Sequence, residues 1–157
     1  MGRVKNFNEY MNESKKSGNV AGIAILWQDS ILLVHPTNAS WKKSVFGIPK
    51  GGIEFGEDPI DTAIRELEEE IGIKIKYSEL EPEMHVADHY DSHGNFKSQL
   101  MYFILRISDP SEIGLEGTRV PKDQLQLEEV DWAGFVKIDD AYPKIHRSQL
   151  IILDRVR

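Results

Sequence analysis

The chain has 157 residues, a formal net charge of −7 and no cysteine. This length is typical of one domain with one hydrophobic core. The absence of cysteine excludes disulfides and thiolate metal ligands, so a bound metal would need oxygen or nitrogen ligands. The acidic charge argues against an extended nucleic-acid surface, because such surfaces depend on clustered lysine and arginine.

The hydropathy pattern argues against a membrane protein. The sequence has no run of eighteen apolar residues, and its N-terminal residues lack the apolar stretch of a secretory signal. We therefore expect a cytoplasmic protein with one domain over residues 1–157. Residues 1–18 are expected at the periphery of this domain, with a short helix over residues 7–16.

The first half of the chain predicts strands that lead into a helix. Two apolar runs are separated by a polar turn, which is typical of a β-hairpin. A polar loop and two short strands should follow. In chain order, the expected elements are a strand over Val20–Trp27, a strand over Ile31–His35, the loop Pro36–Ser44, and short strands at Phe46–Ile48 and Ile53–Phe55.

Residues 59–71 carry the clearest helix signal. The Asp58 side chain can cap a backbone N–H, Pro59 suits the first helical position, and Gly72 can end the helix. Apolar residues recur at helical spacing, which predicts a face that packs on the core. These residues are Ile60, Ala63, Ile64, Leu67 and Ile71.

The opposite face of this helix carries three glutamates. Glu66, Glu69 and Glu70 are spaced i, i+3 and i+4, so their carboxylates should converge. Such spacing occurs on ordinary solvated faces, because charged residues are mostly exposed. Hard cations such as Mg²⁺, however, take oxygen ligands and are often held by carboxylates together with substrate phosphates. A glycine-rich approach over residues 48–57 would let the backbone run close to such a ligand.

The second half of the chain predicts further strands and a closing helix. Residues 74–89 carry irregular strand signals, and Gly94-Asn95 predicts a turn. A long strand over Phe96–Ile107, a loop over residues 108–128, a last strand over Val130–Val136 and a helix from Pro143 to Arg155 should follow. This mixture of strands and helices indicates an α/β (α+β) fold.

Residues 51–73 resemble the Nudix box, G-x5-E-x7-R-E-U-x-E-E-x-G-U, in which U is aliphatic. Every defined position matches, by Gly51, Glu57, Arg65, Glu66, Leu67, Glu69, Glu70, Gly72 and Ile73. The resemblance implies a mixed β-sheet sandwiched between helices, with the box as a loop–helix–loop. It also implies a pyrophosphohydrolase that uses Mg²⁺ or Mn²⁺ and water to cleave a nucleoside diphosphate linked to another moiety.

The same resemblance implies roles for individual residues. Glu66, Glu69 and Glu70 would bind the metal together with the backbone carbonyl of Lys50. The box loop would be braced against its helix by Gly51, Glu57, Arg65 and Gly72. Arg65 and Glu66 are therefore candidate catalytic residues, although Arg65 and Glu69 could form a plain surface ion pair. The candidate general bases are Glu69 in the box and Glu128 or Glu129 before the last strand.

The sequence gives less information about the substrate than about the residues of the box. Lys50 lies in Pro49-Lys50-Gly51, and Tyr90 lies 17 residues after Ile73. Both features resemble the subgroup that hydrolyses dinucleoside polyphosphates such as diadenosine tetraphosphate. Lys50 and Tyr90 are thus candidate substrate-binding residues, with Tyr90 stacking on adenine; Tyr90 could instead be a partly buried strand residue.

Several alternatives remain open at this point. Other substrates of the family are ADP-ribose or sugar nucleotides, oxidised nucleotides and the 5′ end of RNA. A non-catalytic nucleotide-binding regulator is a further alternative. His85, His89 and His93 recur at every fourth residue, but a turn signal follows them, so we expect surface positions rather than a metal site.

Overall fold

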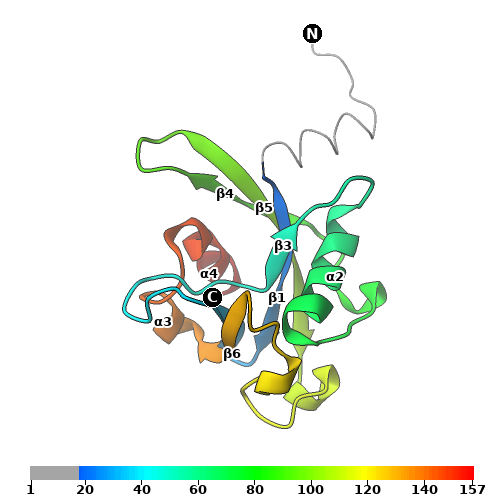
Figure 1. Ribbon diagram of the computed structural model, residues 1–157. Coiled ribbons are helices and arrows are strands. Elements are labelled where there is room, and N and C mark those ends of the chain that lie inside the picture. The colour runs from blue at the N-terminus through cyan, green and yellow to red at the C-terminus, as the bar shows by residue number, and fades with distance from the viewer. Residues whose placement is uncertain (1–17) are drawn as a thin grey trace.

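A computed structural model describes residues 18–157 and has one six-stranded mixed sheet (Figure 1). The expected helix over residues 7–16 lies outside the described residues. The strands are β1 (Val20–Trp27), β2 (Ser30–Pro36), β3 (Lys50–Gly52), β4 (His85–Tyr90), β5 (Phe96–Ile107) and β6 (Val130–Lys137). Their order is β4-β5-β1-β2-β6, with β3 paired to β1. Only β1 and β5 run parallel to each other.

Helices cover both faces of the sheet, as expected for the fold class (Figure 1). Alternate residues of a strand point to opposite faces, so β1 supplies two separate cores. Ile23 and Ile25 pack with α2 (Pro59–Ile71). Ala24 and Leu26 belong to the core that contains α4 (Leu150–Val156). The expected sandwich of a mixed sheet between helices is therefore confirmed.

The α2 helix has the expected boundaries but not the expected N-terminal cap. Pro59 is its first residue, and Gly72 ends it with a left-handed φ of 69° and an N–H that donates to the Glu68 carbonyl. The Asp58 side chain forms no capping hydrogen bond. The neighbouring Glu57 carboxylate accepts hydrogen bonds from the Thr62 hydroxyl at 2.7 Å and from the backbone N–H of Glu54, in the preceding loop, at 3.1 Å.

The strand expected at Ile53–Phe55 is wrong, because β3 lies three residues earlier at Lys50–Gly52. In this register Ala21 of β1 lies opposite Gly51. The absence of a side chain at Gly51 leaves room for the carboxylate of Glu66. The strand expected at Phe46–Ile48 is reduced to isolated bridges.

The closing helix begins at Leu150, not at Pro143. The backbone between these residues pairs with Phe46, because Phe46 N donates to the Lys144 carbonyl and the Phe46 carbonyl accepts from His146 N. These contacts compete with helix formation over the same stretch. A 3₁₀ turn over Arg147–Gln149 then leads into α4, and the short helix α3 (Ile138–Ala141) was not expected. Within residues 18–157, no helix is both long and apolar enough to cross a membrane.

Candidate metal and substrate site

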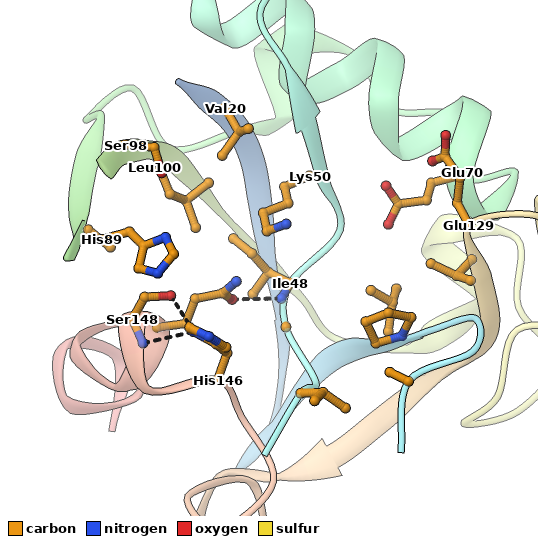
Figure 2. Close-up of a pocket in the computed structure, with 18 residues that line it drawn as sticks. Val20, Ile48, Lys50, Glu70, His89, Ser98, Leu100, Glu129, His146 and Ser148 are labelled. Carbon is orange, nitrogen blue, oxygen red and sulfur yellow. Dashed lines mark hydrogen bonds between the residues drawn. The ribbon is translucent and has the colours of Figure 1, made fainter. Parts of the chain in front are cut away.

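Three carboxylates meet beside a cavity, and two of them, Glu70 and Glu129, line it. Glu66 and Glu70 come from α2, and Glu129 comes from the loop that precedes β6. One oxygen of each lies within 4.8 Å of the others. The backbone fixes this arrangement, because Gln126 N donates to the Glu70 carbonyl at 2.9 Å and holds the loop against the end of α2. Figure 2 shows Glu70 and Glu129 side by side at the cavity wall.

The cluster differs from the three carboxylates that helical spacing suggested. Glu69 is half-exposed, and its carboxylate accepts a hydrogen bond from Arg65 at 3.0 Å. Glu129, which is distant in sequence, lies where the third carboxylate was expected. Glu128 is exposed and is not a member of the cluster. The sequence could not show which loop packs over the end of α2.

The cluster carries a strong electrostatic cost without a cation. Glu70 is only 5% exposed, and this burial raises its pKa to about 8, with further increases from Glu66 and Glu129 and an opposing effect of Lys50. Burial also raises the pKa of Glu66, against the effect of Arg65. A hard divalent cation would offset the repulsion, and the all-oxygen donor set suits Mg²⁺ or Mn²⁺.

Arg65 joins the box loop to α2. Its Nε and Nη2 donate to the Glu57 carboxylate at 2.7 and 3.0 Å, and Nη2 also donates to the Gly52 carbonyl at 3.2 Å. Its Nη1 donates to Glu66 at 2.9 Å. The hydrogen bonds from Arg65 lower the pKa of Glu57 to about 2. One guanidinium therefore contacts the loop, the helix and a member of the acidic cluster.

Gly51 allows the loop to pass directly beside the cluster. A Cβ at this position would lie 2.0 to 2.4 Å from the carboxylate atoms of Glu66. Any side chain at residue 51 would therefore displace the Glu66 carboxylate or β3. The next strand residue behaves differently, since a Cβ at Gly52 would meet nothing within 4 Å.

A cavity of about 520 Å³ extends from the acidic cluster across the sheet. Its apolar lining includes Val20, Ile48 and Leu100, which come from three different segments of the chain. Its opposite end is polar and carries His89 and His146 (Figure 2). This combination of an apolar lining and a few polar groups is typical of a small-molecule site.

Two candidate substrate residues lie in different places. Lys50 lines the cavity, and Figure 2 shows its side chain between the acidic cluster and the histidines. Tyr90 does not line the cavity; it is 49% exposed and packs edge-on against Phe96 at a ring-centroid distance of 5.9 Å. The pairing of β4 with β5 shifts register between His89 and Tyr90. His89 lines the cavity, whereas Tyr90 does not.

The histidines of the cavity were not identified from the sequence. His89 was expected on the surface, and His146 lay within a segment expected to be helical. His146 instead precedes the 3₁₀ turn, where its Nδ1 accepts from Ser148 N at 3.1 Å. A histidine directly before an Arg-Ser pair resembles an ordinary helical surface sequence, so no local signal marked this position.

The chain is similar to several known proteins. Residues 16–155 match the NUDIX domain model. The match to a methanol dehydrogenase activator of Bacillus methanolicus is 45% identical over 62 residues, which are 40% of this chain and 34% of that protein. The match to an ADP-ribose pyrophosphatase of Bacillus subtilis (strain 168) is 39% identical with the same coverage. The aligned region thus spans about a third of these relatives.

Two solved structures share the fold. A MutT NUDIX hydrolase from Burkholderia pseudomallei has a TM-score of 0.65 at 21% identity, with 88% of this chain and 96% of that chain covered. An Ap4A hydrolase of C. elegans, solved as a binary complex, has a TM-score of 0.59 at 23% identity, with 87% and 92% covered. The family model spans nearly the whole chain, and the chain belongs to the NUDIX domain family.

Proposed function

We propose that this protein is a Mg²⁺- or Mn²⁺-dependent pyrophosphohydrolase that cleaves a nucleoside diphosphate linked to another moiety. The observation that carries the proposal is the meeting of Glu66, Glu70 and Glu129 within 4.8 Å, where Glu70 and Glu129 line a cavity of about 520 Å³. Family membership supports it, as do matches to proteins named as hydrolases and pyrophosphatases.

The residues at the cluster fit a hard divalent cation. Glu66, Glu70 and Glu129 would hold it, with the Lys50 carbonyl as a further oxygen donor and Glu69 at the outer side of the helix. Such a cation neutralises phosphate oxygens and lowers the pKa of a coordinated water. Arg65 and Glu57 keep the box loop against α2, and this contact fixes the position of the Glu66 carboxylate.

Glu129 is the leading candidate for the group that accepts a proton from the attacking water, through the carboxylate oxygen that does not hold the cation. Its carboxylate belongs to the cluster, is exposed, and forms no ion pair with any residue in the described range. Glu69 is the second candidate, with one oxygen already bound to Arg65. Glu128 lies outside the cluster and would act only after a movement of its loop.

The leading substrate is a dinucleoside polyphosphate such as diadenosine tetraphosphate. Lys50 supports this choice, because its ammonium group lies in the cavity beyond the acidic cluster, where it can bind a phosphate. The fold likeness to an Ap4A hydrolase is consistent with it. ADP-ribose is the second candidate, favoured by the match to the Bacillus subtilis enzyme.

A substrate panel tests the proposal. Diadenosine tetraphosphate, ADP-ribose, an oxidised nucleoside triphosphate and 5′-triphosphorylated RNA are each incubated with Mg²⁺ and with EDTA, and the products are separated by chromatography. We expect Mg²⁺-dependent release of mononucleotides, fastest from diadenosine tetraphosphate. Binding without turnover of any member would support a nucleotide-binding regulator instead.

A further inference from the structure

The end of the cavity away from the acidic cluster gathers cationic and N–H-donating side chains. Lys50, His89 and His146 line the cavity, and the rings of the two histidines lie 5.4 Å apart between centroids. Arg147 follows His146, and its guanidinium donates to the Tyr90 carbonyl at 3.4 Å, on the strand that carries His89. β3, β4 and the segment before α4 thus bring Lys50, His89 and His146 together (Figure 2), and the exposed Arg147 lies next to this end of the cavity without lining it.

These side chains form no salt bridge with a carboxylate of residues 18–157, although the charge of Lys50 acts on Glu70 over a longer distance. Over residues 18–157, no ion pair within 4.0 Å involves Lys50, His89, His146 or Arg147. Asp88, next to His89 in the sequence, is exposed and accepts from Gln99 at 2.9 Å. In a chain with a net charge of −7, a lysine, an arginine and two histidine N–H donors around one end of a cavity indicate affinity for an anion.

His146 is held in one tautomer by its neighbours. Its Nδ1 accepts the backbone N–H of Ser148 at 3.1 Å, so this nitrogen carries a lone pair. The Ser148 hydroxyl lies 2.7 Å from the same nitrogen. The ring proton of the neutral imidazole is therefore on Nε2, which has no protein partner among the described residues. Burial lowers the pKa of His146, and the charges of His89, Arg147 and Lys50 lower it further.

We propose that Lys50, His89, His146 and Arg147 form a second anion subsite, which binds a phosphate of the substrate that lies beyond the linkage held at the acidic cluster. This inference rests on the proposed function. His146 donates from Nε2 to a phosphate oxygen, and Lys50 and Arg147 supply positive charge. The subsite favours substrates with an extended phosphate chain over those, such as ADP-ribose, whose distal part is a neutral sugar.

Pyrophosphate binding to metal-free protein tests the subsite directly. Inorganic pyrophosphate is titrated calorimetrically in EDTA into the wild type and into His146→Ser. Serine is a good N-cap residue and can accept the Ser148 N–H, so this change removes the Nε2 donor and keeps the turn. We expect about a tenfold loss of affinity, as for a hydrogen bond to a charged group. Arg147→Gln, on an exposed side chain, should also weaken binding.

His93→Ser is the matched control, because His93 is exposed on the turn between β4 and β5 and does not line the cavity. It should bind pyrophosphate as the wild type does. The subsite is refuted if the wild type does not bind pyrophosphate in EDTA, or if His146→Ser and Arg147→Gln bind it as tightly as His93→Ser.

Kinetics separate this inference from the proposed function. His146→Ser should raise KM for diadenosine tetraphosphate by about tenfold and leave KM for ADP-ribose unchanged. Equal KM changes for both substrates would contradict the subsite while leaving the hydrolase intact. If no substrate is hydrolysed but pyrophosphate binding still depends on His146, the proposed function fails and the subsite stands.

Discussion

Gly51 and Glu66 are in such close contact that a single added methyl group at residue 51 would lie 2.0 Å from the carboxylate carbon of Glu66. The carboxylate of Glu66 can take its place in the acidic cluster only because residue 51 has no side chain. The backbone of β3 and the geometry of the acidic cluster are therefore coupled through one contact.

Gly51→Ala should lower kcat/KM by at least about tenfold, because it forces the Glu66 carboxylate away from Glu70 and Glu129. Gly52→Ala is the matched control, since its Cβ would meet nothing within 4 Å. Steady-state assays of both variants, with circular dichroism to verify folding, check this expectation. Equal activities of the two variants would contradict the coupling.

Glu70→Gln should remove activity and raise the thermal stability of the metal-free protein. The pKa of Glu70 is raised to about 8, so its ionisation opposes folding, and this cost grows as the pH rises from about 4.5 towards 8. The stability gain of the variant in EDTA should therefore increase over the same range. Scanning calorimetry at several pH values measures it.

Glu68→Gln is the matched control for this experiment, because Glu68 lies on the same helix but is exposed and forms an ion pair with Lys74 at 3.4 Å. Mg²⁺ should raise the melting temperature of the wild type and of this control, but not that of Glu70→Gln. A Glu70→Gln protein stabilised by Mg²⁺ to the same extent as the wild type would show that the cluster does not bind the cation.

Glu57→Gln should destabilise the protein in a pH-dependent way. The pKa of Glu57 is lowered from 4.5 to about 2, so its contribution is complete above 4.5 and is lost as the pH falls through about 2. We expect a loss of about 1–3 kcal/mol near neutral pH, reduced by partial exposure of the ion pair. Urea unfolding should show the two proteins converging in acid, whereas a gap independent of pH would argue against the Glu57–Arg65 contact as its source.

Glu129→Gln should reduce kcat by about a hundredfold or more if this residue accepts the proton of the attacking water. Glu128→Gln should have little effect, because Glu128 is exposed and lies outside the cluster. Single-turnover rates separate these outcomes from slow product release. Glu69→Gln is compared in the same assay, and a larger loss for it than for Glu129→Gln would transfer the role of base to Glu69.

Local signals predicted the elements whose structure depends on neighbouring residues in the sequence. Pro59 and Gly72 gave the ends of α2, and apolar spacing gave its buried face. The register of β3 was not predictable, because it depends on pairing with β1, which is distant in the sequence. The closing helix began too early in the prediction, because backbone pairing with Phe46 uses the residues before it.

Only the part of the candidate site that lies on α2 was predictable from the sequence. The spacing of Glu66, Glu69 and Glu70 placed them on one side of α2, but it could not show which carboxylates face the cavity. That outcome depends on the loop that brings Glu129 against Glu70, and this contact joins residues distant in the sequence. The position of His146 was not predicted either, because the residues that line the cavity with it are also distant in the sequence.

The most direct test of the acidic cluster as a catalytic metal site is the hydrolysis of diadenosine tetraphosphate by the wild type and by Glu70→Gln. Each protein is incubated with the substrate in Mg²⁺ and in EDTA, and the products are measured by chromatography. The proposed function predicts mononucleotide products only from the wild type with Mg²⁺, and a rate lower by orders of magnitude for the variant. Equal hydrolysis by the two proteins, or hydrolysis by the wild type that persists in EDTA, would contradict it.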